Sequence, residues 1–130
     1  MLNHLSLGVS DLARSSRFYD AIFEALGYVC VDRSSSSVGY GQAGSEEDQI
    51  RLFSAETVAA RTLPKFHIAF SAPTIQSVGV FHRAALREGG QDAGAPAYRR
   101  NYGPEYYAAF VLDPDGYKLE AKYEPFAGLA

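Results

Sequence analysis

The feature that most constrains the fold is an internal repeat. The segments LNHLSLGVSD, residues 2–11, and PKFHIAFSAP, residues 64–73, each have the pattern of a buried strand that contains one histidine. A shift of 63 residues aligns similar residues of the two halves: His4 with His67, Leu5 with Ile68, Phe18 with Phe81 and Gly27 with Gly90. Half of a 130-residue chain is too small to bury a good core alone. The repeat therefore predicts a single domain over residues 1–130, made of modules at about 1–60 and about 64–125.

Helical and strand-like patterns follow one another in the same order in both modules. Residues 11–25 and 74–88 have apolar side chains at helical spacing, a possible cap at the first residue and a glycine beyond the end. Shorter apolar segments predict strands at 28–32, 38–40, 49–53, 106–112 and 117–123. The sequence Asp113-Pro114-Asp115-Gly116 predicts a turn that makes the last two strands a hairpin. Residues 91–103 are expected to be irregular.

Composition and charge narrow the classes of partner. A net charge of −3, with no block of lysine or arginine, gives no electrostatic support for nucleic-acid binding. The longest apolar run, residues 106–112, is too short to cross a membrane, and no secretory signal pattern is visible. Cys30 is the only cysteine, which excludes an internal disulfide, and its apolar neighbours predict a small core residue. We therefore expect a cytoplasmic protein without a nucleic-acid or membrane partner.

Alternation along the strands separates an apolar face from a face with polar side chains. His4 and His67 each oppose apolar neighbours in their strands. Arg51 and Glu120 occupy matching places at a shift of 69 residues, each between two apolar residues that point the other way. The apolar faces can pack on the helices. The opposite faces would then carry all four polar side chains, as the wall of a cleft would.

This pattern resembles the vicinal oxygen chelate superfamily, which includes glyoxalase I, fosfomycin-resistance proteins, extradiol dioxygenases and bleomycin-resistance proteins. The motifs that carry the resemblance are HLSLGVSDLARSSRFYDAIFEALGY at 4–28, FHIAFSAP at 66–73 and YYAAFVLDPDGYKLEA at 106–121. The resemblance covers nearly the whole chain. It implies an α+β fold of two βαβββ modules, whose curved mixed sheets form a cleft for a metal ion and a ligand.

By this resemblance, His4, His67 and Glu120 stand at the positions that supply metal ligands. Two imidazoles and one carboxylate with open positions suit one divalent ion, namely Fe(II), Mn, Ni, Co or Zn. The open positions would let oxygens of a small-molecule substrate bind the ion, which polarises them. The alternative is two satisfied histidines and an exposed glutamate on a strand. The third histidine, His82, falls on the second predicted helix and is expected at the surface.

Arg51 departs from the pattern of glyoxalase I, which has a carboxylate ligand at this place. A guanidinium group stays protonated and cannot ligate a metal. Three roles remain open for Arg51: it turns outward, it holds an anionic group of a substrate, or it pairs with Glu120 and leaves the cleft without metal. Glu46, Glu47 or Glu56 would replace the missing ligand only after a register shift.

The prediction that follows is a metal-dependent enzyme of lyase or dioxygenase type, and the resemblance alone implies a homodimer. The candidate catalytic residues are Glu120 and Tyr102, and the candidate substrate-binding residues are Arg51, Tyr40, Tyr102 and Tyr106. Tyr102 and Tyr106 form either a lip over the cleft or packing at a dimer surface. The alternative function is a metal-free protein that sequesters a small molecule, as bleomycin-resistance proteins do.

Overall fold

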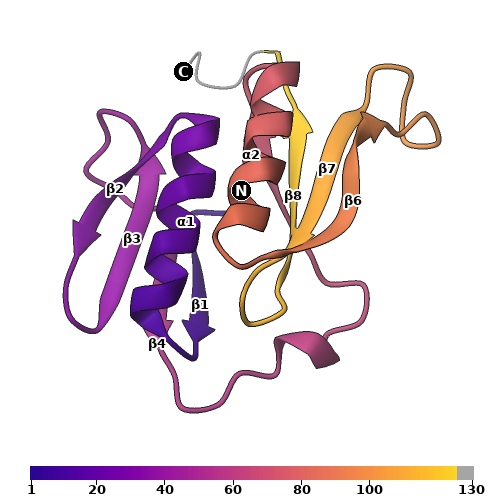
Figure 1. The fold of residues 1–130 in the computed structure, drawn as a ribbon. Helices are drawn as coiled ribbons and strands as arrows, with labels where there is room; N and C mark the ends of the chain where they lie inside the picture. The colour runs from indigo at the N-terminus through magenta and orange to yellow at the C-terminus, as the bar shows by residue number, and fades with distance from the viewer. Residues whose placement is uncertain (126–130) are drawn as a thin grey trace.

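The computed structural model describes residues 1–125, which form two α-helices and eight strands in two sequential sets (Figure 1). The first set is β1 (Leu5–Val9), α1 (Leu12–Leu26), β2 (Tyr28–Arg33), β3 (Ser37–Gln42) and β4 (Ile50–Ser54). A short 3-10 turn, η1 (Ala60–Thr62), lies in the connection to the second set. The second set is β5 (Ile68–Ala72), α2 (Ile75–Arg87), β6 (Gln91–Tyr98), β7 (Tyr107–Leu112) and β8 (Lys118–Tyr123).

Both α-helices begin and end within one residue of the predicted positions. The side chain of Asp11 accepts a hydrogen bond from the backbone N–H of Arg14 at the start of α1, and Gly27, with φ of 85°, ends that helix. Thr74 and Ser77 form a reciprocal capping box at the start of α2. These signals are local, so the sequence alone locates them. No helix in the described part of the chain is long and apolar enough to span a membrane.

Each set forms one four-stranded mixed sheet. The strand order is β1-β4-β3-β2 in the first sheet and β5-β8-β7-β6 in the second. The pairs β1–β4 and β5–β8, at one edge of each sheet, are parallel, and their registers are equivalent: Leu5 pairs with Ile50, and Ile68 pairs with Leu119. These registers agree with the two shifts of the sequence repeat. The predicted α+β fold of two βαβββ modules is confirmed.

One shared core lies between the modules. The helices α1 and α2 pack side by side at the centre of the molecule (Figure 1). Both sheets contribute apolar side chains to the same buried cluster, among them Val9, Leu52, Val111 and Leu119. Each sheet therefore turns one face to the helices, and we call the opposite face its open face. Because α1 covers the first sheet, α2 covers the second and the two helices pack against each other, the two open faces point apart within the part of the chain that the structure describes.

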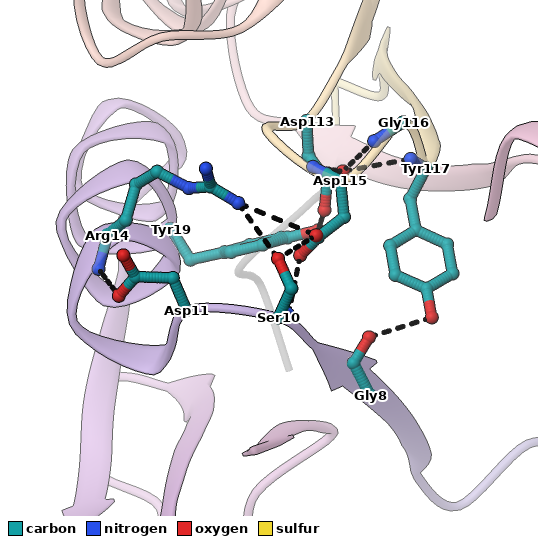
Figure 2. Close-up of polar contacts among 9 residues, drawn as sticks. All are labelled: Gly8, Ser10, Asp11, Arg14, Tyr19, Asp113, Asp115, Gly116 and Tyr117. Atoms are coloured by element: carbon teal, nitrogen blue, oxygen red, sulfur yellow. Dashed lines mark hydrogen bonds and ion pairs between the residues drawn. The ribbon is translucent and has the colours of Figure 1, made fainter. Parts of the chain in front are cut away.

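The turn between β7 and β8 joins the second module to the first (Figure 2). The hydroxyl of Tyr19, on α1, donates to Oδ2 of Asp113 across 2.6 Å, and both side chains are buried. The hydroxyl of Tyr117 donates to the backbone carbonyl of Gly8, at 2.9 Å. The predicted Asp-Pro-Asp-Gly turn is thus also a contact between the modules.

Asp113 organises this turn from inside. Its Oδ1 accepts hydrogen bonds from the backbone N–H groups of Asp115, Gly116 and Tyr117, at 2.9, 2.8 and 2.8 Å. Burial raises the pKa of Asp113, and the hydrogen bonds from Tyr19 and the backbone act in the opposite direction. Asp115, held by the same turn, accepts hydrogen bonds from Ser10 of the first module (Figure 2).

Two expectations from the sequence are wrong. Residues 91–98 form the edge strand β6 instead of an irregular segment. Gly94 and Pro96 weaken the strand signal, but an edge strand tolerates proline, and the ladder with β7 is irregular around Gly94. Cys30 is exposed instead of buried, because β2 is the edge strand of the first sheet.

Candidate functional site

The open face of the second sheet carries a buried carboxylate. Glu120 lies on this face because its neighbours Leu119 and Ala121 point into the core, yet only 1% of Glu120 is exposed. The hydroxyl of Tyr106 donates to its Oε2 at 2.5 Å, and Nε2 of His67 lies 3.0 Å from its Oε1. Both carboxylate oxygens therefore have a polar partner, as a buried charge requires.

Aromatic and cationic side chains surround this carboxylate. Phe110 is the register partner of Glu120 in the β7–β8 ladder, and its ring centroid lies 5.9 Å from that of His67. The guanidinium carbon of Arg99 and Nζ of Lys118 lie 5.4 and 5.0 Å from the centroid of the Phe110 ring. Sequence reasoning misses Phe110. The signal that finds it is the predicted hairpin, which sets Phe110 opposite Glu120.

Tyr106 is a hydrogen-bond donor at neutral pH. Burial, followed by the hydrogen bond to Glu120 and its negative charge, raises the pKa of Tyr106. The phenol therefore keeps its proton and fixes Oε2 of Glu120. A base with this environment would be poor, so Tyr106 is suited to positioning and proton holding.

His4 has the matching place in the first module. It directly precedes β1, as His67 precedes the first residue of β5, and its Nδ1 lies 2.7 Å from Oδ1 of Asn3. Because the open faces point apart, His4 does not meet His67 and Glu120 within one chain. In residues 1–125, no three His, Cys, Asp or Glu side chains are close enough together to hold a metal ion. The chain therefore brings together two of the three predicted ligands.

Arg51 occupies on β4 the place that Glu120 occupies on β8, because Arg51 pairs with Ser6 and Glu120 pairs with Ala69. No register shift replaces it by a glutamate. Its Nε donates to Asp48 at 2.7 Å, and its Nη2 donates to Asp32 at 2.9 Å. A third bond, from Nη1 to the hydroxyl of Ser37, measures 2.8 Å. The guanidinium is thus bound within its own module and does not pair with Glu120 in this chain.

Three further residues lie in different surroundings. Tyr40 is buried on the helix-facing side of the first sheet, where its hydroxyl donates to Asp20 on α1 at 2.7 Å. Tyr102 is 64% exposed, and its ring lies 5.2 Å from that of Tyr106. His82 is less exposed than expected, because 12% of its side chain is accessible and Nε2 lies 2.8 Å from Oδ1 of Asp92. Tyr102 borders Glu120 through Tyr106, whereas Tyr40 and His82 do not border it.

The donor atoms of His67 and Glu120 fit a divalent metal ion in type and spacing. An imidazole nitrogen and a carboxylate oxygen each bind such ions at about 2.0–2.2 Å. Two ligands at that distance and at right angles to each other lie about 3.0 Å apart, which matches the separation of Nε2 and Oε1. The pair is therefore a suitable half of a site that needs at least one more protein ligand.

The comparisons with known proteins agree with the fold. The sequence model of the Glyoxalase/Bleomycin resistance protein/Dioxygenase superfamily matches residues 1–121. A glyoxalase/bleomycin resistance protein from Albidiferax ferrireducens T118 is similar in structure, with a TM-score of 0.78 and 26% identity over 95% of this chain and 98% of that chain. No curated protein sequence matches the chain.

Two more distant structures show the same fold. The fosfomycin resistance protein FosX from Listeria monocytogenes has a TM-score of 0.70 and 20% identity, over 95% of this chain and 93% of that chain. A glyoxalase I variant from Zea mays has a TM-score of 0.68 and 22% identity, over 92% of this chain and 45% of that chain.

Proposed function

Because the chain belongs to the glyoxalase/bleomycin resistance protein/dioxygenase superfamily, we propose that it is an enzyme that binds a divalent metal ion and a small oxygen-chelating substrate. The observation that carries this proposal is the pairing of His67 with the buried Glu120 on the open face of the second sheet. Burying a carboxylate costs folding free energy unless it is compensated. A ligand role accounts for keeping one there.

In this proposal the third ligand is His4 of the partner subunit in a homodimer. The open faces point apart within a chain, so the first sheet of one copy must lie on the second sheet of another copy to complete the site. A two-fold symmetric pair of chains then contains two identical sites. This arrangement uses the same three residues that the sequence predicts, and it requires no rearrangement of the chain.

Each residue near Glu120 has a definite task in the proposed site. The ion, which is Fe(II), Mn, Ni, Co or Zn, would supply Lewis-acid polarisation of the substrate oxygens. Glu120 and His67 would hold it, while Tyr106 keeps Oε2 of Glu120 fixed and protonates no substrate atom itself. The exposed Tyr102 offers an aromatic face to a planar substrate.

Arg51 remains a proposed substrate-binding residue, but its hydrogen bonds within the module leave few of its N–H groups for a substrate. Two of its nitrogens already donate to Asp48 and Asp32, and the third donates to Ser37. Only its remaining N–H groups are available for an anionic group of a substrate. The proposed reaction class is lyase or dioxygenase, and Glu120 and Tyr102 remain its proposed catalytic residues.

Metal complementation between two variants tests the proposal. His4→Ala and His67→Ala are purified separately, and metal content is measured for Fe(II), Mn(II), Ni(II) and Zn(II). Each variant alone should lose the ion. After the two are unfolded, mixed and refolded together, random pairing should recover about a quarter of the wild-type content, because half of the dimers are mixed and each has one intact site.

The control is a mixture of His67→Ala with Glu120→Gln. Both substitutions affect the half-site that comes from one chain, so mixed dimers contain no intact site and no metal should return. Recovery in this control would contradict a shared site. Full metal binding by His4→Ala alone would remove His4 from the ligand set.

A metal-free small-molecule binding protein is the second candidate, and one observation favours it. Both oxygens of Glu120 already have partners in Tyr106 and His67, so the cluster is satisfied without an ion. In that case the wild-type protein should contain no metal after purification in buffer without chelator. It should still bind a small molecule, and His67→Ala should weaken that binding.

A further inference from the structure

A hollow with basic walls lies beside His67. Its volume is about 260 Å³, and it is formed by the segment before β5 and by the region around the β7–β8 turn. Four basic side chains line it: Arg61, Lys65, His67 and Lys118. The other lining residues are apolar or glycine, and no carboxylate is among them. This local excess of positive charge stands against a net charge of −3 for the whole chain.

The three permanent cations of this hollow have no carboxylate partner among residues 1–125. The ion pairs of the described chain involve other basic residues, such as Arg51 with Asp48 and Lys122 with Glu124. Lys118 instead lies over the ring of Phe110. Like charges that are brought together without counterions repel one another. Such a cluster is stabilised when an anion binds between its members.

The backbone around the hollow supports the same conclusion. Lys65 has φ of 61° and is the one non-glycine residue with positive φ in the described part of the chain. A lysine gains nothing locally from this conformation, which glycine adopts freely. The stem of Arg61 packs closely on Gly116, where any Cβ would collide with it. The stem of Arg61 therefore lies against the β7–β8 turn, at the wall of the hollow.

We propose that this hollow binds the oxyanion group of a small ligand, of phosphate type. Three cations that line one hollow from different segments suit a compact dianion with several oxygens. The hollow is smaller than the pockets of about 300–1,000 Å³ that enclose drug-sized ligands, so it suits one ionised group. His67 belongs both to this hollow and to the Glu120 cluster. An anion bound here would place the rest of its molecule beside Glu120, so the inference rests on the proposed function.

Titration with inorganic phosphate tests this inference on metal-stripped protein in buffer of low chloride content. Isothermal titration calorimetry should detect saturable binding, and Arg61→Gln and Lys118→Gln should each weaken it about tenfold, the loss expected for one charge-assisted hydrogen bond. Lys65→Gly removes the ammonium group and also relieves the positive φ. It should therefore weaken phosphate binding without lowering the melting temperature.

The matched control is Arg83→Gln, which removes an exposed arginine from α2, outside the hollow. It should leave phosphate affinity unchanged. Phosphate binding that is absent in the wild type, or equal in all four variants, would overturn the inference. A titration with phenyl phosphate distinguishes two sources of the anion. If phenyl phosphate binds more tightly than inorganic phosphate, the site takes the phosphate group of a larger ligand. If the two affinities are equal, the site takes free phosphate. Either result supports the site.

Glu120→Gln separates this inference from the proposed function. This variant should lose the metal ion and still bind phosphate, because Glu120 does not line the hollow. If wild type binds metal but no phosphate, only the anion site fails. If it binds phosphate but no metal, the metal-dependent function fails and the anion site stands.

Discussion

Tyr19 of α1 donates its hydroxyl hydrogen to the buried carboxylate of Asp113, across 2.6 Å and from one module to the other. Both groups are buried, so a water molecule cannot take the place of either partner if the other is removed. The bond is therefore a specific link between the modules, and its loss should lower the free energy of unfolding of the whole domain.

Tyr19→Phe should lower the free energy of unfolding by about 1–3 kcal/mol, since it leaves a buried carboxylate oxygen without its donor. Urea denaturation followed by circular dichroism measures the change. Tyr117→Phe is the control, because it removes a hydroxyl that donates to the neutral carbonyl of Gly8. Its cost should be smaller, about 0.5–1.5 kcal/mol. Equal losses in the two variants would show that the charge of Asp113 adds nothing to the link.

Tyr106→Phe should weaken metal binding about 10–100-fold, the range measured for groups that orient a metal ligand. The physical reason is that Oε2 of Glu120 loses its hydrogen bond and the carboxylate is no longer fixed. Competition against a fluorescent chelator measures the affinity. Tyr102→Phe is the matched control, because the hydroxyl of Tyr102 makes no bond to Glu120. An unchanged affinity in Tyr106→Phe would mean that Glu120 is held by its packing alone.

His82 and Asp92 form a pair whose effect on pH dependence has a definite sign. The hydrogen bond from His82, followed by that from the backbone N–H of Gly94, lowers the pKa of Asp92 below its ordinary value of 3.8. A carboxyl group with a lowered pKa stabilises the folded state above its unfolded value. That contribution is present above pH 3.8 and is lost as the pH falls through the folded pKa.

His82→Phe should therefore raise the pKa of Asp92 toward 3.8. Carboxyl carbon chemical shifts, followed by NMR through an acid titration, report this pKa directly. His4→Phe serves as the control, since His4 bonds Asn3 and is remote in sequence from Asp92. An Asp92 pKa that stays equally low in His82→Phe would assign the shift to the backbone of Gly94.

Arg51 and Asp48 should show a coupling energy of about 0.3–1 kcal/mol in a double-mutant cycle of alanine variants, as is usual for partly exposed ion pairs. Gly39→Ala provides an independent check, because a Cβ at this position would lie 2.6 Å from Nη2 of Arg51 and 2.9 Å from Oδ2 of Asp48. It should abolish the coupling by forcing the guanidinium away. A coupling energy near zero in the wild-type background would show that Arg51 is not fixed by Asp48 in solution.

The sequence predicts those features whose signals are local or repeated. Asp11, Gly27 and Thr74 locate the helix ends, because caps act through neighbouring backbone groups. The equivalent registers of the two parallel pairs agree with the two repeat shifts, and alternation fixes which residues share a face. The β6 strand and the exposed Cys30 escape prediction, because edge position is a property of the sheet and not of a short segment.

The site is predicted less completely, for a related reason. Alternation correctly sets His67 and Glu120 on one face, and the structure brings them within 3.0 Å. Whether His4 joins them depends on which way the two sheets turn about the shared core, and no motif of the sequence encodes that choice. The partners of Arg51 are likewise unpredicted, because Asp48 comes from a loop and Asp32 from a different strand.

The position of the β7–β8 turn has a consequence for motion. Phe110 and Glu120 stand on the two strands of one hairpin, and the tip of that hairpin is tethered to the first module by Tyr19 and Tyr117. These contacts restrict movement of the hairpin tip relative to the rest of the second sheet. The contacts of Tyr19 and Tyr117 therefore also limit the mobility of Glu120. A change that breaks them should make this carboxylate more mobile.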